Sequence, residues 1–420
     1  MSLDVDSIIS NAQPINLRYS WQKKIVASAM FAANSFSREQ NENLGLCFAA
    51  AFDLIVAAHY YSLVGHKGWL YSPDKNKALF LYPYTNACPR SSLKDVFIYH
   101  SAHKPQSGSI GTVTSTYLGF SIEWYFLNVL KENIKVYQGS EPIDIIIKDT
   151  EQKTCFLGEI KAAPLVTFPL AVEGDIQIEE IEGRTTKIDK PREWPLSDLY
   201  HKTLSIMLFN KNFDPLLVPL GTKTDQRDQD WAAIGLLALL AQDASFFGNY
   251  YACWIDVFKR YSGTLPKRGP YWLANSCGGP VPRPSNWPRR NAGSGYETIS
   301  DNKSSVGMDR TDDIKKGTYQ VLKIGAETKF RDCGWNIKTG IISNLPAIRH
   351  NQEYLEPVQD ILWTISEKKF VKKVGDLPHD LKIFNLFDGL ISFPICHSKD
   401  EWINRVFCFS DDVREHKNGS

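Results

Sequence analysis

The chain has 420 residues, of which 43% are hydrophobic and 23% charged, and its net charge is +1. This composition is that of an ordinary soluble globular protein with room for two or three packing units, and the net charge alone neither favours nor excludes a nucleic-acid partner. No apolar run approaches the ~20 residues that span a bilayer, and the N-terminus "MSLDVDSIIS" lacks the basic and apolar regions of a secretory signal, so we expect a cytoplasmic protein with no membrane partner.

Several catalytic classes are excluded by missing motifs. The eight cysteines form no CxxC pair, which favours free, mostly buried thiols over a structural zinc site. No G-x-S-x-G nucleophile motif, Walker A motif or G-x-G-x-x-G motif occurs. His350 in "AIRHNQEY" and His397 in "PICHS" are interpreted as structural or base-contacting residues rather than catalytic ones.

The first part of the chain has the apolar spacing of helices. Residues 1–110 are expected to be mainly helical, because "SWQKKIVASAMFAANSF" and "LGLCFAAAFDLIVAAHYYSLV" repeat apolar residues at helical intervals. The segment Thr116 to Ile134 is a strongly apolar predicted helix that contains one acid, Glu123. A β-hairpin is expected to follow it directly.

Two later segments compete to supply the helix and strand that complete a sheet begun by this hairpin. The first is Leu196 to Phe209 followed by "PLLVPLG". The second is "RTDDIKKGTYQVLKIGAETK" followed by the strand Ile337 to Leu345. We favour the second, because Thr311 can cap the helix and Asp312 and Asp313 suit its positive end. A further strand is expected in "LFDGLISFPI".

These elements predict an α/β (α+β) fold with a central mixed β-sheet flanked by helices. We expect a helical N-terminal region at 1–110, the first part of a core at 111–190, an inserted subdomain at 191–300, and the rest of the core with the C-terminal region at 301–420. Because the favoured helix and strand begin after residue 300, the segment 191–300 between the hairpin and that helix becomes an insertion.

Positive charge is concentrated on one stretch, because no Asp or Glu occurs from Val257 to Tyr296. Basic groups interleaved with aromatic rings suit phosphate contact and base stacking, which favours a polyanionic partner. The alternative is a solvated surface loop with a few buried aromatics. The residues are Lys259, Arg260, Lys267, Arg268, Arg283, Arg289 and Arg290, with Tyr261, Tyr271, Trp272, Trp287 and Tyr296 between them.

The hairpin "EPIDIIIKDTEQKTCFLGEIKAAPL" places charged residues inside otherwise apolar strands. A turn centred near Glu151 and Gln152 puts Asp144 opposite Glu159. Lys161 follows Glu159 by two positions, so it projects from the same face of the strand. The sequence therefore predicts two carboxylates close together with a lysine alongside.

Facing carboxylates repel each other, and a hard divalent cation with oxygen ligands removes that conflict. Such a cation polarises a phosphoryl oxygen and activates a bound water, while a nearby ammonium can orient or help deprotonate that water. These are the parts needed for phosphodiester hydrolysis. The alternative is a surface hairpin edge on which Glu159 and Lys161 merely pair, since acid-x-Lys tripeptides occur elsewhere, as at Glu151.

The "PID" of Pro142 to Asp144 and the "EIK" of Glu159 to Lys161 resemble the motif of the PD-(D/E)XK nuclease superfamily, and within it the type II restriction endonucleases. The resemblance covers residues 116–165. It implies a restriction-endonuclease-like core in which Asp144 and Glu159 bind Mg2+, the Ile160 carbonyl completes the coordination, and Lys161 assists the attacking water. It also implies a catalytic role for Glu123 on the preceding helix.

A restriction hydrolase would take double-stranded DNA as its substrate. A homodimer matching a palindromic site is expected, and a cognate DNA methyltransferase in the same restriction-modification system. Two alternatives stay open, namely a structure-specific repair or recombination nuclease and a non-catalytic DNA-binding protein with a nuclease-like sheet. The candidate DNA-contacting residues are Lys267, Arg268, Arg283, Asn286, Trp287, Arg289, Arg290, Ser304 and Arg310.

Overall fold

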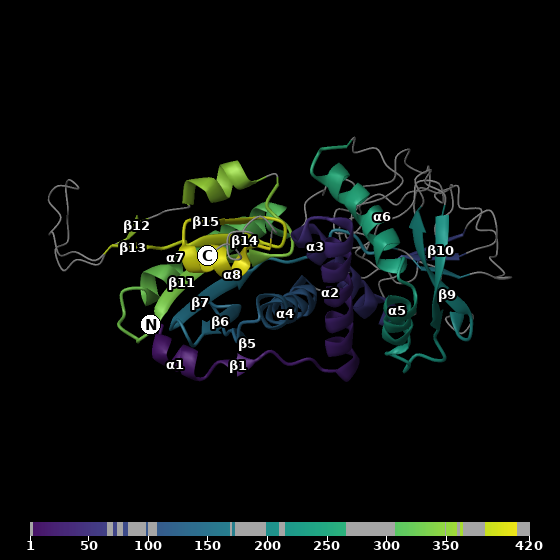
Figure 1. Cartoon of the computed structure of the whole chain (residues 1–420), viewed down its shortest axis with the longest axis horizontal. Coiled ribbons are helices and arrows are strands. Elements are labelled where there is room, and N and C mark those ends of the chain that lie inside the picture. Colours follow the sequence, from purple (N-terminus) through teal and green to yellow (C-terminus); the bar gives the residue numbers. More distant parts are fainter. Residues whose placement is uncertain are drawn as a thin grey trace. The chain divides into compact units, whose positions relative to one another are not determined.

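A computed structural model of the chain forms two compact units (Figure 1). Unit 1 comprises Met1–Asn16, Leu118–Ala162 and Gly307–Ser420, and unit 2 comprises Leu17–Tyr117 and Ala163–Val306. The residues that the structure describes are 3–64, 70–73, 79–82, 98–99, 107–168, 170–172, 199–209, 215–265, 307–348, 350–358, 362–363 and 383–409.

Unit 1 is built on a seven-stranded mixed sheet in the order β1-β5-β6-β7-β11-β14-β15. The strands β5, β6 and β7 run antiparallel to their neighbours in turn, whereas β7, β11 and β14 are mutually parallel. The mixed sheet expected from the sequence is therefore confirmed. The strands are β1 (Gln13–Pro14), β5 (Lys135–Gln138), β6 (Ile145–Asp149), β7 (Thr154–Ile160), β11 (Asn336–Ser343), β14 (Gly389–Ser392) and β15 (Cys396–Ser398).

The helix and strand that complete this sheet are the favoured pair, α7 (Thr311–Thr328) and β11, because β11 pairs along its length with β7. In the alternative segment, Leu196 to Phe209, residues Thr203–Phe209 form a strand of unit 2 and not a helix. Helix α7 is capped one residue earlier than the expected Thr311. Arg310 is the N-cap, and the Thr311 hydroxyl instead lies 3.4 Å from Nε2 of His350.

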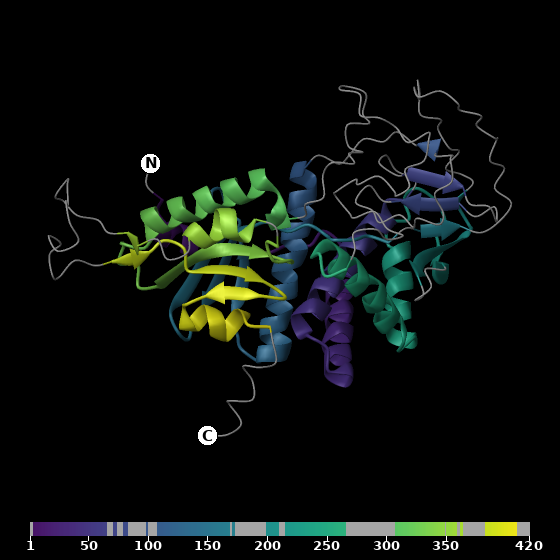
Figure 2. The ribbon, with the colours of Figure 1, turned by 90° about the horizontal axis from the view of Figure 1, so that it is seen from above.

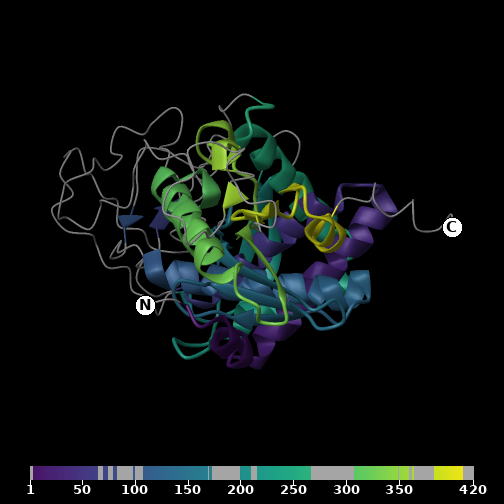
Figure 3. The ribbon, with the colours of Figure 1, turned by 90° about the vertical axis from the view of Figure 1, so that its left-hand side faces the viewer.

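Helices cover both faces of the unit 1 sheet. Cys155 and Leu157 of β7 pack against Ile324 of α7 and against the short helix α1 (Val5–Ser10). Phe156 points the opposite way and contacts Phe407 of α8 (Glu401–Phe407). Phe407 in turn contacts Phe126, in the π-helical turn Phe126–Leu130 that follows α4 (Ser107–Tyr125). α7 and α8 accordingly lie on opposite sides of the strands (Figures 2 and 3).

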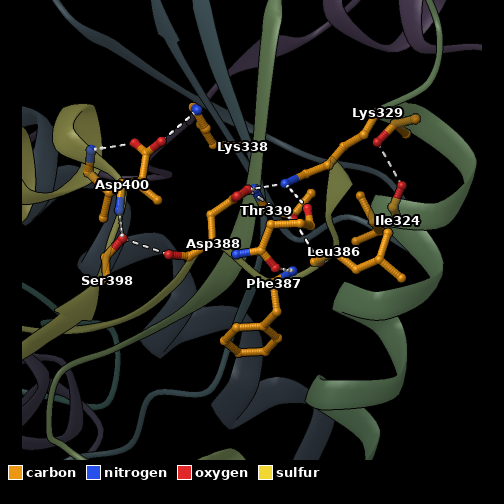
Figure 4. A network of polar contacts seen from close by, with 12 residues as sticks. Ile324, Lys329, Lys338, Thr339, Leu386, Phe387, Asp388, Ser398 and Asp400 are labelled. Atoms are coloured by element: carbon orange, nitrogen blue, oxygen red, sulfur yellow. Dashed lines mark hydrogen bonds and ion pairs between the residues drawn. The ribbon is translucent and has the colours of Figure 1, made fainter. Parts of the chain in front are cut away.

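A buried polar network holds β11 against the loop that enters β14 (Figure 4). Asp388 accepts a hydrogen bond of 2.7 Å from the Thr339 N–H and pairs with Lys329, which follows α7. The Asp388 N–H donates to the Thr339 carbonyl at 2.8 Å. Burial lowers the Lys329 pKa, and the Asp388 carboxylate opposes that effect. The pairing therefore compensates a charge that is costly to desolvate alone.

In its described residues, unit 2 contains a six-stranded sheet in the order β10-β9-β8-β3-β2-β4, together with helices and the first part of α4. Three of its strands, β2, β3 and β4, lie in the region that the sequence pattern predicted to be mainly helical. The strands are β2 (Leu70–Pro73), β3 (Leu79–Tyr82), β4 (Ile98–Tyr99), β8 (Leu170–Val172), β9 (Thr203–Phe209) and β10 (Pro215–Thr222). The helices are α2 (Ser20–Gln40), α3 (Leu44–Ser62), α5 (Trp231–Gln242) and α6 (Phe246–Tyr261).

Helix α3 is long and apolar enough to cross a membrane, but 89% of its most apolar 18 residues are buried within the protein. Helices α5 and α6 are long and apolar enough to cross a membrane only when they are taken together, and a bend of 107° separates them. Within the described part of the chain Cys155, Cys333 and Cys396 are free thiols.

One acid, Asp53, is completely buried on α3 in unit 2. Its Oδ2 accepts hydrogen bonds from the Leu165 N–H at 2.8 Å, the Val166 N–H at 2.9 Å and the Trp254 indole at 2.7 Å. Burial nevertheless raises the Asp53 pKa to about 8. Asp53 thus ties α3 to α6 and to the segment that follows the hairpin.

Candidate active site

The hairpin pairs in the register expected from the sequence, with Ile145 opposite Gly158 and Asp149 opposite Thr154. Asp144 lies one residue before β6, just beyond the last paired residue Ile145, and its N–H donates to the Gly158 carbonyl at 2.9 Å. Its Oδ2 accepts a hydrogen bond of 3.0 Å from the Ile160 N–H. The Asp144 carboxylate is therefore held against the end of β7, next to Glu159.

Glu159 and Lys161 project from the same face of β7, as predicted, and their side chains form an ion pair. The face is the one covered by α7, since it also carries Leu157. Glu159 is 7% exposed, whereas Asp144 is exposed. The Lys161 Nζ also lies 3.4 Å from the Ile160 carbonyl oxygen.

Burial raises the pKa of Glu159 to about 7. The Lys161 ammonium lowers this pKa, and the adjacent Asp144 carboxylate raises it. The conflict between facing carboxylates that the sequence predicted is thus present, and Lys161 only partly relieves it. Glu159 consequently changes its charge near neutral pH.

The backbone of Lys161 is fixed by β11 on both sides of the residue. Its N–H donates to the Ile342 carbonyl at 3.0 Å, and its carbonyl accepts a 2.7 Å hydrogen bond from the Ser343 hydroxyl. Ser343 was not among the residues singled out from the sequence. Its position at the end of "TGIIS" identifies it only when the pairing of β11 with β7 is known.

The oxygen atoms available to a cation come from Asp144, Glu159 and the Ile160 carbonyl. In the part of the chain that the structure describes, no group of three or more His, Cys, Asp or Glu residues could hold a metal ion. Two carboxylates and one carbonyl are hard oxygen ligands, which fit Mg2+ and leave its other positions to water and substrate phosphate. Because the Ile160 N–H faces Asp144, strand geometry directs its carbonyl to the same side.

Glu123 lies on α4 and interacts with the start of β5, where its Oε1 accepts a 3.4 Å hydrogen bond from the Val136 N–H. Among the described residues no hydrogen bond joins Glu123 to Asp144, Glu159 or Lys161. Its catalytic role therefore stays a prediction.

Of the candidate DNA-contacting residues, only Arg310 falls within the described residues. It precedes α7, is 36% exposed at its side chain, and forms an ion pair of 3.1 Å with Asp313. The DNA-contacting roles of the whole set stay predictions. The candidates outside the described residues are Lys267, Arg268, Arg283, Asn286, Trp287, Arg289, Arg290 and Ser304.

Comparison of the chain with protein-family models, with curated proteins and with solved structures produced no match.

Proposed function

We propose that this protein is a Mg2+-dependent endonuclease of the type II restriction class, which hydrolyses phosphodiester bonds in double-stranded DNA at a defined sequence. One observation carries the proposal. Asp144, Glu159 and Lys161 come together at the end of β7, with the two acids adjacent and the lysine on the same face.

The order of elements around these residues supports the proposal. Helix α4 precedes the antiparallel strands β5, β6 and β7, and α7 then leads into β11, which is parallel to β7. The resemblance to PD-(D/E)XK nucleases implies a helix before the first core strand and a further helix and strand after the lysine. In this chain the latter pair follows a long intervening segment.

Each residue has a distinct part in the proposed reaction. Asp144, Glu159 and the Ile160 carbonyl would hold Mg2+, which polarises the phosphoryl oxygen and lowers the pKa of a water when it is bound. Lys161 would orient the attacking water and offset negative charge at phosphorus. Glu159 must be ionised to bind a cation, so its raised pKa predicts that metal affinity increases as the pH rises through about 7.

Under this proposal the enzyme acts in the cytoplasm as a homodimer on a palindromic site, with a DNA methyltransferase protecting the host sequence. The acid-free stretch from Val257 to Tyr296 would supply much of the DNA contact.

The test is incubation of the purified protein with plasmid and bacteriophage DNA, with Mg2+ or with EDTA, followed by gel electrophoresis. Discrete fragments are expected only with Mg2+, and Asp144→Ala and Glu159→Ala should remove them. Glu151→Ala is the matched control, because Glu151 is an exposed acid of the same hairpin that also precedes a lysine by two positions.

Each other result has a definite meaning. Smearing, or cutting of junctions only, would favour the structure-specific nuclease, and DNA binding without cutting would favour the non-catalytic alternative. Cutting that survives in Asp144→Ala or Glu159→Ala would refute the site.

A further inference from the structure

Gly317 lies in the interior of α7, where glycine is less favourable than alanine. It is buried, and a Cβ atom at this position would lie 3.2 Å from Cδ1 of Ile341. The same Cβ would lie 3.4 Å from Cε and 3.6 Å from Cγ of Lys161. The backbone of α7 therefore rests directly on the aliphatic part of the Lys161 side chain.

This contact matters because the Lys161 backbone is already fixed by Ile342 and Ser343. The remaining freedom is in the long side chain, and ordering a lysine side chain has an entropic cost. Its ammonium contacts Glu159 at one end. Between the fixed backbone and the ammonium, the aliphatic part of the Lys161 side chain packs against the backbone of α7 at Gly317, which limits its movement.

We propose that Gly317 is a positioning residue, whose missing side chain lets α7 hold the Lys161 ammonium beside Glu159 in the geometry that the proposed hydrolysis requires. This inference rests on the proposed function for its catalytic consequence, but the placement of Lys161 can be tested without any nuclease activity.

The competing explanation is that Gly317 only makes room for Ile341, the nearer of its two neighbours. Ile341→Val removes the Cδ1 atom involved and leaves Lys161 untouched. If Gly317 serves packing alone, Gly317→Ala combined with Ile341→Val should behave like Ile341→Val. If Gly317 positions the lysine, the defect should persist in the double variant.

The first measurement is the rate at which formaldehyde and cyanoborohydride dimethylate Lys161, followed by mass spectrometry with the exposed Lys153 as internal reference. Gly317→Leu should increase the Lys161 rate severalfold, because the ammonium is displaced from Glu159 into solvent, and Gly317→Ala should give a smaller increase. Gly111→Ala is the matched control, since a Cβ at this α4 glycine meets nothing within 4 Å.

The second measurement is the rate of DNA cleavage over a range of DNA concentrations at saturating Mg2+. Displacement of the lysine by about 1 Å should lower kcat by about 100-fold with little change in KM, and no further loss is expected in a Lys161→Ala background. An unchanged Lys161 labelling rate in every folded Gly317 variant, or full rescue by Ile341→Val, would overturn the inference. If the wild-type protein does not cut DNA, the proposed function fails, while the labelling still decides whether Gly317 holds Lys161.

Discussion

The buried carboxylate of Glu159 should make the wild-type protein less stable as the pH rises, and Glu159→Gln should remove this dependence. The ordinary pKa of a glutamate is 4.5, and in the folded protein burial raises that of Glu159 to about 7. Between these values the folded state binds a proton that the unfolded state has released. The stabilising effect of this proton is fully present below pH 4.5 and is lost as the pH rises through 7.

The magnitude follows from the pKa difference. Each pKa unit corresponds to about 1.4 kcal/mol, so ionised Glu159 destabilises the fold by about 3 kcal/mol when the pH is well above 7. At pH 5 only a small part of this penalty is present. We therefore expect the difference in unfolding free energy between Glu159→Gln and the wild type to change by about 2 kcal/mol between pH 5 and pH 8, in favour of the variant.

Unit 1 has to be observed separately, so the assay is urea unfolding followed by hydrogen exchange of the peptide that spans β6 and β7. Glu151→Gln on the turn of the same hairpin is the control, because Glu151 is exposed and should leave the pH dependence unchanged. Parallel pH profiles for the wild type and Glu159→Gln would refute the conclusion that Glu159 is held in an unfavourable environment.

Three other substitutions test buried polar contacts, two in unit 1 and one in unit 2. Lys329→Met leaves Asp388 buried without its cation and should lower the unfolding free energy by about 4 kcal/mol in urea denaturation; a loss below 1 kcal/mol would contradict this. Trp402→Phe removes the 2.8 Å hydrogen bond to Asp149 and should reduce the unfolding free energy by about 2 kcal/mol. An unchanged unfolding free energy would show that the bond does not stabilise the fold. The wild type should lose unit 2 stability as the pH rises from about 4 to about 8, and Asp53→Asn should abolish this loss, as measured by Tm against pH. The same Tm profile in the wild type and the variant would show that Asp53 is not buried.

Part of the site could be predicted from the sequence because the hairpin is a local structure. Its register depends on a short polar turn and on alternating side chains, so Asp144, Glu159 and Lys161 could be placed on one face without any long-range information. The helix α7 and strand β11 were also predicted correctly, because charge at the helix start and β-branched residues in the strand are signals of the segments themselves.

Other features depend on contacts between distant residues. Strand β9 pairs with β8 and β10 within unit 2, and this pairing outweighed the helical spacing suggested for Leu196 to Phe209. The sequence by itself determined which residues form the charged face of the hairpin. Only the tertiary structure decided that Glu159 is buried enough to titrate near neutral pH and that Ser343 and Gly317 hold Lys161, because desolvation and contacts between distant residues arise when separate segments pack together.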